Sequence, residues 1–176
     1  KCHPDLVMTQ ENLGKIFCQQ DKLDMAEEIF NRGLISLHRV LGDSNERVAS
    51  IHNCLGVLMN KKGDFESGIR HYKKALKIRL DKLGHVHPNV ALSYSNLGSA
   101  YSDKGEYDRT IEYHEKSLKI RLDKLGQVHP DVATSYSNLG WAYKDKGEYD
   151  RAIECHVKAL KIKQAKLGDN HRDVAS

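Results

Sequence analysis

The sequence is poor in the residues that build disulfide, metal or membrane structures. It has four cysteines, three prolines and one tryptophan among 176 residues. The cysteines are scattered and form no CxxC pair, so we expect neither a zinc ribbon nor a disulfide framework, and a reducing, cytoplasmic environment suits the chain. No apolar run approaches the roughly 20 residues that a membrane helix needs, so we expect no membrane partner.

Charge of one sign and catalytic motifs are also missing. The 28 Lys and Arg residues nearly balance the 24 Asp and Glu residues, and the two signs alternate in stretches such as KIRLDKLG. Nucleic-acid-binding proteins usually gather basic residues in one stripe, so we expect no nucleic-acid partner. HExxH, P-loop, GxGxxG and GxSxG motifs do not occur. We therefore expect a protein that is not an enzyme and that holds no cofactor and no metal.

What the sequence does contain is an internal repeat. The letters YSNLG stand at residues 94–98 and again 42 positions later at 136–140. Four complete copies span residues 3–44, 45–86, 87–128 and 129–170. Residues 171–176 begin a fifth. Self-similarity at a fixed period indicates an architecture in which each copy packs on its neighbours. We therefore expect one domain over residues 1–176.

Glycine and proline mark the same breaks in every copy. Eleven of the 13 glycines fall at three repeat positions, and all three prolines fall at another. In the fourth copy, Pro130 suits the first position of a helix, and Gly147 suits the left-handed residue that ends one. Apolar or small residues recur at helical spacing between them. A second helical stretch runs from Tyr149 to a stop at Gly168. Each copy is therefore predicted to form a helix–turn–helix hairpin.

A glycine lies inside each predicted first helix, where glycine costs about 1 kcal/mol relative to alanine. These glycines are Gly14, Gly56, Gly98 and Gly140. A cost that recurs in every copy is expected where the partner helix approaches too closely for a larger side chain. Ala152 and Ala159 offer matching small positions on the second helix of the fourth copy.

The pattern Y-x2-L-G-x2-Y-x8-A-x3-H-x2-A over residues 136–159 resembles the tetratricopeptide repeat (TPR). The 42-residue unit, with HPDVA at its start and LG at its end, is similar to the longer variant of kinesin light chains and nephrocystin-type proteins. Where the family has an aromatic residue, His114 and His156 depart from it, whereas Phe30 and Tyr72 keep it. The resemblance covers essentially the whole chain. It implies an all-α, right-handed α-solenoid of helix–turn–helix repeats, with four full repeats and the start of a fifth.

The resemblance also implies a function. TPR arrays are interaction scaffolds, which implies that the first helices line a concave groove and bind an extended peptide or a segment of a protein partner. A structural, self-associating spacer array and a regulatory segment of a larger enzyme are the alternatives. Both ends of the chain fall within repeats, so we expect uncapped ends and an open apolar face on the last helix. We expect this face to meet more chain, another protomer by end-to-end self-association, or a neighbouring molecule in a crystal.

We expect the groove residues at the positions that the apolar stripe of the first helices leaves free. The expected peptide-binding residues are Asn12, Lys15, Asn53, Asn60, Asn96, Ser99, Asn138, Trp141 and Lys144. The resemblance implies that Asn12, Asn96 and Asn138 hold the peptide backbone, since an amide pairs with both N–H and C=O groups. Alternatively they bond to a neighbouring helix or to water. Trp141 either anchors a partner or packs on the adjacent repeat.

The ten histidines raise the alternative of a metal site. Four of them share one repeat position, just outside the predicted helix starts. These are His3, His87, His129 and His171. Their spacing meets no zinc template, so we expect structural or solvent-facing roles. Cys155 and His156 are neighbours on a helix and point in different directions, which makes a catalytic pair improbable.

Overall fold

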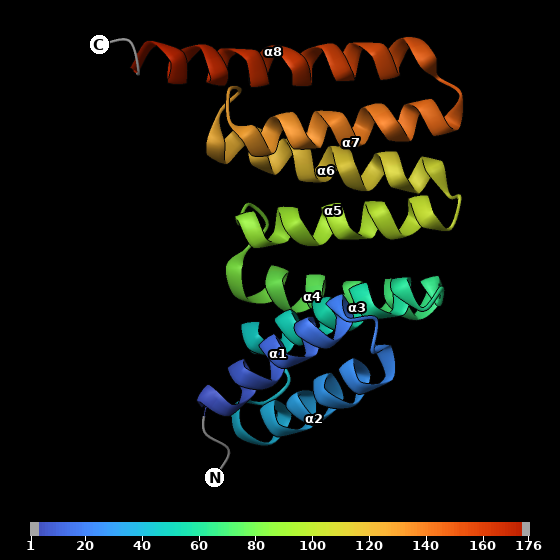
Figure 1. Cartoon of the computed structure of the whole chain (residues 1–176), viewed down its shortest axis with the longest axis vertical. Coiled ribbons are helices and arrows are strands. Elements are labelled where there is room, and N and C mark those ends of the chain that lie inside the picture. Colours follow the sequence, from blue (N-terminus) through green and yellow to red (C-terminus); the bar gives the residue numbers. More distant parts are fainter. Residues whose placement is uncertain (1–3, 174–176) are drawn as a thin grey trace. The chain divides into compact units, whose positions relative to one another are not determined.

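The described chain folds into eight α-helices and contains no strand (Figure 1). The computed structural model describes the backbone of residues 4–173 and the side chains of residues 8–166. The helices are α1 (Pro4–Gln19), α2 (Leu23–Leu41), α3 (Glu46–Lys61), α4 (Phe65–Leu83), α5 (Pro88–Asp103), α6 (Tyr107–Leu125), α7 (Pro130–Lys146) and α8 (Tyr149–Asp173). Two helices per copy confirm the predicted all-α helical repeat. None of the described helices has an apolar stretch long enough to cross a lipid bilayer.

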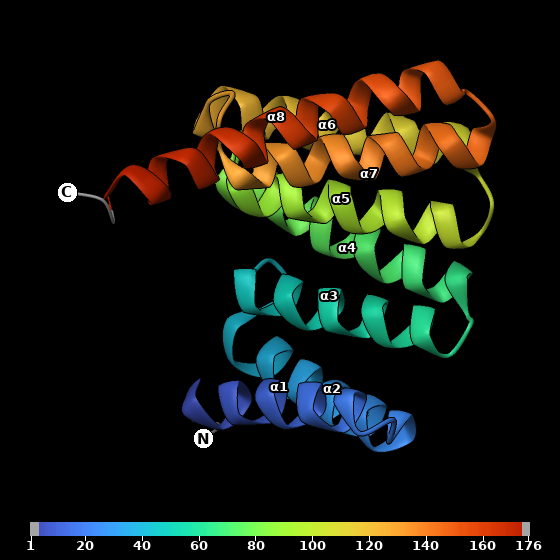
Figure 2. The same cartoon turned by 45° about the horizontal axis from the view of Figure 1, so that its top comes forward.

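The helices group into two compact units that separate between the second and third copies. The first unit holds α1–α4 and ends at His85, and the second begins at Val86 and holds α5–α8. Within the first unit α1 pairs with α2, α3 pairs with α4, and α2 packs on α3. The second unit repeats this order, with hairpins α5–α6 and α7–α8 and a joint between α6 and α7 (Figure 2).

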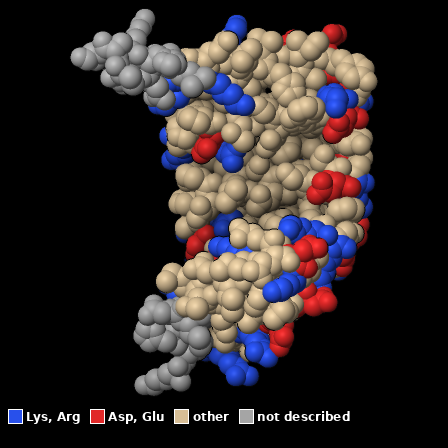
Figure 3. Space-filling view, viewed as in Figure 1, with Lys and Arg blue, Asp and Glu red and all other residues tan. Residues whose placement is uncertain are grey.

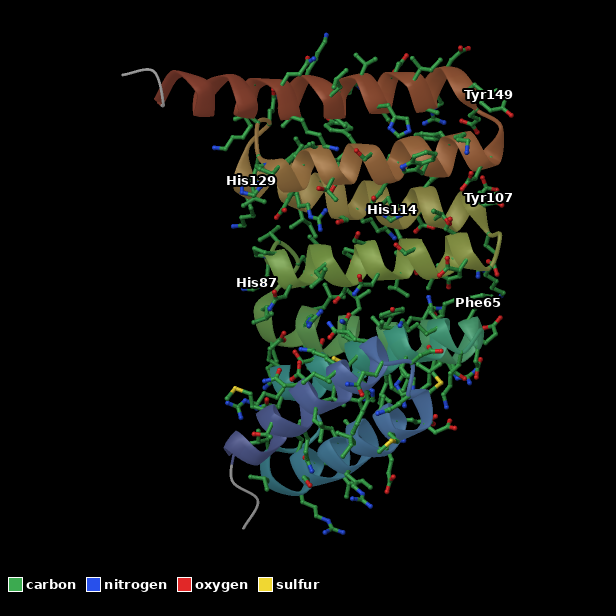
Figure 4. The ribbon with its side chains drawn as sticks, viewed as in Figure 1. Phe65, His87, Tyr107, His114, His129 and Tyr149 are labelled. Carbon is green, nitrogen blue, oxygen red and sulfur yellow. The ribbon has the colours of Figure 1, made fainter. Side chains whose placement is uncertain are left out.

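Side-chain caps begin three of the four first helices. His87 and His129 each accept a hydrogen bond at Nδ1, at 3.1 Å, from the backbone N–H two residues further on. Asn45 does the same for α3 through Oδ1, at 2.9 Å. Figure 4 shows His87 and His129 at the starts of α5 and α7. The structural role expected for these two histidines is therefore that of an N-cap. His3 lies outside the described residues.

Glycine ends α7 as the sequence predicts. Gly147 has φ 88° and ψ 6°, which is the left-handed region, and its N–H donates to the carbonyl groups of the last turn. Residues with a Cβ adopt this conformation at a cost of about 1 to 2 kcal/mol.

We expect Gly147→Ala to lower the free energy of unfolding by about 1 kcal/mol, because alanine is strained at a positive φ. Urea denaturation followed by the fluorescence of Trp141, the single tryptophan of the chain, measures the change. Gly147→Asn should lose less, since asparagine tolerates the left-handed region. Equal stability of Gly147→Ala and the parent chain would contradict this prediction.

The end of α8 differs from the sequence prediction. The sequence predicts a stop at Gly168, but α8 continues to Asp173, so His171 lies inside a helix and not before one. Gly126 ends α6 where the chain turns back so that α7 can pack on it. No helix follows α8 within residues 4–173, and glycine inside a helix costs only about 1 kcal/mol. Residues 174–176 of the expected fifth repeat lie outside the described residues.

A ring from the second helix covers the internal glycine of each first helix. The pairs are Gly14–Phe30, Gly56–Tyr72, Gly98–His114 and Gly140–His156. A Cβ added to any of these glycines would lie between 2.4 and 2.7 Å from the nearest ring atom. The predicted close approach is therefore confirmed, but a ring and not a small residue fills the space. Ala152 and Ala159, the expected small partners, are buried elsewhere along the same helix.

Tyr143 links α7 to the preceding copy. Its hydroxyl donates to Glu115 Oε1 of α6 at 2.9 Å and accepts from Arg151 Nη2 of α8 at 2.6 Å. Burial, reinforced by the bond to Glu115, raises the pKa of Tyr143 to about 12. The tyrosine therefore stays protonated and holds three helices of the second unit together.

Candidate functional site

The predicted peptide-binding residues fall into two groups, one in each unit. The α1/α3 face comprises Asn12, Lys15, Asn53 and Asn60. The α5/α7 face comprises Asn96, Ser99, Asn138, Trp141 and Lys144. In the α5/α7 face, Asn96 and Ser99 of α5 occupy the repeat positions of Asn138 and Trp141 of α7, and both helices start with a histidine cap. The two faces lie in different units, so each is described separately below.

Trp141 supplies the largest open apolar side chain of the α5/α7 face, with 55% of its surface accessible. The His156 ring of α8 meets it nearly edge-on, with ring centroids 5.2 Å apart. The Lys144 Nζ atom lies 4.9 Å from the centroid of the indole ring, within the range of cation–π attraction. Two neighbours therefore support the indole, while more than half of its surface stays open.

The amide and hydroxyl groups of this face are partly engaged. Asn96 and Asn138 are half-buried, at equivalent positions of α5 and α7. The Ser99 hydroxyl donates to the carbonyl oxygen of Ser95 in its own helix, at 3.2 Å. Because its one proton is used there, Ser99 offers a ligand only an acceptor.

The surface over α5 and α7 is mostly uncharged. In Figure 3 the centre of the upper part is mostly tan, and charged side chains lie along its left side and along its right edge, near the α5–α6 and α7–α8 turns. At that edge Lys146 Nζ lies 2.9 Å from Asp108 Oδ1 and 2.6 Å from Glu148 Oε1. The turn charges thus neutralise one another, and such exposed pairs add little stability.

The α1/α3 face carries more charge. Lys15 Nζ lies 2.6 Å from Glu11 Oε1, and the hydrogen bond to Glu11 raises the pKa of Lys15. Lys61 Nζ of α3 donates to the backbone carbonyl of Cys18 at the end of α1, at 2.8 Å. Asn12 is exposed beside them, and Asn53 is half-buried.

Asn60 lies against the second helix of its own hairpin. Its Oδ1 atom is 2.0 Å from the position that a Cβ on Gly68 of α4 would take. In the fourth copy, Lys144 stands at the repeat position of Asn60, and Ala152 stands at that of Gly68. The missing side chain at Gly68 therefore makes room for the amide of Asn60. The sequence alone shows that glycine replaces alanine at position 68. It does not show that the Asn60 side chain fills the space that the missing Cβ leaves.

A histidine pair in the first unit was not anticipated from the sequence. His52 Nδ1 of α3 and His71 Nδ1 of α4 are 3.0 Å apart, and the ring centroids are 5.2 Å apart. Burial lowers the pKa of His52 to about 4 and also lowers the pKa of His71. Both rings are therefore neutral at pH 7, so that one Nδ1 donates to the other. Tyr94 and Tyr113 occupy the same positions in the third copy, which shows that the site accepts ring packing.

The described cysteines are buried free thiols, namely Cys18, Cys54 and Cys155. Burial, with the nearby Glu11 adding to it, raises the pKa of Cys54 to about 12. A thiol that stays protonated is a poor nucleophile. Within the part of the chain that the structure describes, no group of three His, Cys, Asp or Glu side chains is arranged to hold a metal ion.

Comparison with protein-family models matches the tetratricopeptide repeat at residues 47–123 and again at residues 92–165. Together the two matches cover more than half of the chain. A comparison with curated protein sequences finds no match.

Several solved structures share this fold. BtubC (BKLC) from P. vanneervenii is 29% identical, with a TM-score of 0.87 over 96% of this chain and 67% of that chain. A candidate kinesin light chain from Podosopora anserina with nearly identical TPR-like repeats is 20% identical, with a TM-score of 0.79 over 93% of this chain and 78% of that chain. MamA is 26% identical, with a TM-score of 0.67 over 94% of this chain and 82% of that chain.

These neighbours confirm the predicted resemblance, including the likeness to kinesin light chain-type repeats, and with it the helical-repeat solenoid class. The family is one of protein-interaction scaffolds. The chain belongs to the tetratricopeptide repeat family, because the family model matches most of its residues and solved structures share its fold and its order of hairpins.

Proposed function

We propose that this chain is a non-catalytic interaction scaffold whose α5/α7 face binds an extended segment of a partner protein, with Trp141 as the anchor. Membership of the TPR family supports the interaction role. The single observation that carries the location is the 55% exposure of an indole that His156 and Lys144 hold in place.

The indole supplies most of the binding free energy in this proposal. Covering its open half removes on the order of 100 Å² of apolar surface from water, which is worth roughly 2 kcal/mol. Because His156 and Lys144 already restrain the ring, little rotamer entropy is lost on binding. The amides of Asn96 and Asn138 then bond to the backbone of the bound segment, whatever its sequence.

Lys144 is the charged residue of this face beside Trp141, with its Nζ atom 4.9 Å from the indole centroid. A segment that places an apolar residue on Trp141 and a carbonyl group beside Lys144 leaves no charge desolvated without a partner. Binding to this face should therefore depend little on salt concentration. The buried free thiols support the proposed cytoplasmic location.

We expect Trp141→Ala to weaken peptide binding about thirtyfold, because a central tryptophan anchor contributes about 2 kcal/mol. A displayed library of unstructured peptides, selected against the parent chain, supplies the probes. Titration of the selected peptides into the parent chain should shift the Trp141 fluorescence, and fluorescence anisotropy of labelled peptides measures both affinities. Helical content should be unchanged.

Tyr149→Ala is the matched control, since Tyr149 is an aromatic residue of the same unit with 66% exposure that lies outside the α5/α7 face. Peptide affinity should survive that change and also survive Trp141→Phe in large part. Selected peptides that bind Trp141→Ala as tightly as the parent chain would rule out the proposed anchor.

A further inference from the structure

An open cavity of the same kind occurs in each unit, at the joint between two consecutive copies. In the second unit its volume is about 340 Å³, and its wall comes from α6, the α6–α7 loop, α7 and α8. The residues that line it are Leu122, Gln127, Tyr136, Lys158, Lys161 and Ile162. Each of them stands two repeats after a residue that lines a cavity between α2, α3 and α4. We name the two the second-unit cavity and the first-unit cavity.

The second-unit cavity does not depend on where the sequence stops. Lys116 and Lys119 of α6 hold the repeat positions of Lys158 and Lys161. Both stay exposed although α7 packs on α6. The first-unit cavity has the same lining positions, and further helices follow it in the chain. The cavity is therefore a feature of the joint between copies.

The two cavities differ in charge. The first-unit cavity is lined by two acidic and two lysine side chains, namely Asp43, Asp81, Lys74 and Lys77. In the second unit, Gln127 and Ala165 hold the positions of the two acids, whereas both lysines are kept. Among the described residues that line the second-unit cavity, none is acidic. This cavity therefore carries two positive charges that its own wall does not balance.

Lys161 is the lysine with the least competition for its charge. Its equivalent Lys77 precedes Asp81 by four residues, a spacing at which opposite charges on a helix attract each other. Lys161 precedes Ala165 at the same spacing, so this attraction is absent. The ammonium group of Lys161 is exposed and is therefore available to an anion from outside the chain.

The rest of the wall suits an apolar group beside that anion. Lys158 Nζ lies 5.7 Å from the centroid of the Tyr136 ring, which is a cation–π distance. Glu154, one turn before Lys158 on α8, competes for this second ammonium group, so Lys161 should contribute more to binding. Two half-buried apolar side chains complete the wall, namely Leu122 and Ile162.

We propose that the second-unit cavity binds an acidic segment of a partner protein, with a carboxylate at its two lysines and a neighbouring apolar side chain on Leu122 and Ile162. The carboxylate belongs to a protein segment because the family is one of protein-interaction scaffolds. A phosphate fits less well, since no arginine fork lies among the described lining residues.

This cavity is separate from the α5/α7 face. Tyr136 of the cavity and Trp141 of the face are five residues apart on α7, which turns their side chains about 140° from each other. Binding in the cavity depends on charge, whereas binding to Trp141 depends on apolar contact. The two proposals can therefore fail independently.

An NMR titration of the full chain with the blocked dipeptide acetyl-leucyl-glutamate amide tests the proposal. The amide signals of Gln127, Lys158 and Lys161 should shift, whereas acetyl-leucyl-glutamine amide should leave them in place. Lys161→Gln should weaken binding about fivefold, because it removes one of the two charges. The affinity should also fall as salt is added. Equal shifts with the two dipeptides would overturn the proposal.

The first-unit cavity supplies the matched control. Gln127→Asp combined with Ala165→Asp gives the second-unit cavity the acids of the first, and this variant should bind the glutamate dipeptide at least ~tenfold more weakly. Asp43→Gln combined with Asp81→Ala should add a second set of shifts in the first unit. The spread of the amide signals shows whether each variant is folded. A double-aspartate variant that binds as tightly as the parent chain would show that these charges do not select the ligand, and the proposal would fail.

Two further arms identify the ligand and the site. Phenyl phosphate that binds more tightly than the glutamate dipeptide would make this a phosphate site, which would overturn the choice of a carboxylate. Trp141→Ala should bind the dipeptide as the parent chain does. Loss of dipeptide binding in Trp141→Ala would place the dipeptide on the α5/α7 face and remove the cavity as a separate site.

Discussion

Lowering the pH from 7 to 4 should reduce the stability of the second unit by about 3 kcal/mol through His114 alone. His114 is 4% exposed, and its ring lies over Gly98. Burial, with a smaller contribution from the positive charge of Arg121, lowers the pKa of His114 from 6.5 to about 4. The stability therefore changes with pH, because the unfolded chain binds a proton at His114 at a higher pH than the folded chain does.

The sign follows from the two pKa values. Above pH 6.5 the imidazole of His114 is neutral in both the folded and the unfolded chain, so folding carries no proton cost. As the pH falls below 6.5 the unfolded chain binds a proton that the folded chain does not, and the free energy of unfolding decreases. The loss stops growing below about pH 4, where the folded chain is protonated too. At about 1.4 kcal/mol per pH unit, this window yields the stated loss.

The repeats themselves supply the control substitution. Phe30 and Tyr72 occupy the position of His114 in the first two copies, so a neutral ring fits over the glycine. His114→Phe should abolish this part of the pH dependence while other titrating groups respond as before. Urea denaturation at pH 7 and pH 4, followed by the fluorescence of Trp141 in the same unit, gives the difference between the two chains. An equal loss of stability in His114→Phe on acidification would disprove the role of His114.

The sequence was sufficient for the parts of the fold that local chemistry determines. Pro130 at the start of α7 and Gly147 at its end follow from backbone geometry, which depends on one residue at a time. Gly168 shows the limit of this reasoning. A glycine allows a helix to end but does not force the helix to end. Whether the helix stops at that glycine therefore depends on whether another helix packs there.

Spacing along α7 predicts that Trp141 is exposed, but it does not predict which residues contact it. Trp141 is exposed at the position that the free stripe of α7 indicates, whereas its support by His156 requires the packing of α7 on α8. Asn60 occupies an equally free position by spacing, yet it lies against Gly68 of α4. Spacing along one helix identifies which residues share a face. The neighbouring helix then decides whether a given side chain on that face stays open.

Removing the ring over an internal glycine should have the largest effect on stability. Phe30 is 1% exposed and belongs to the core cluster of the first unit. Phe30→Ala should lower the free energy of unfolding by about 3 to 5 kcal/mol, because it removes apolar contacts and leaves a cavity over Gly14. Phe30→Tyr should cost far less, since Tyr72 fills the same position in the second copy. Hydrogen exchange of the α1–α3 backbone amides, measured by mass spectrometry, reports this unit separately.

A second substitution separates close packing from general loss of a large side chain. In the parent chain, Gly14→Ala places a Cβ 2.4 Å from the Phe30 ring, so it should destabilise by about 1 to 3 kcal/mol. In the Phe30→Ala background that clash is gone, and the higher helix propensity of alanine should make Gly14→Ala stabilising by up to about 1 kcal/mol. A change of sign between the two backgrounds is expected only if the ring itself makes glycine necessary. The same loss in both backgrounds would mean that the glycine serves the backbone of α1 and not the ring of α2.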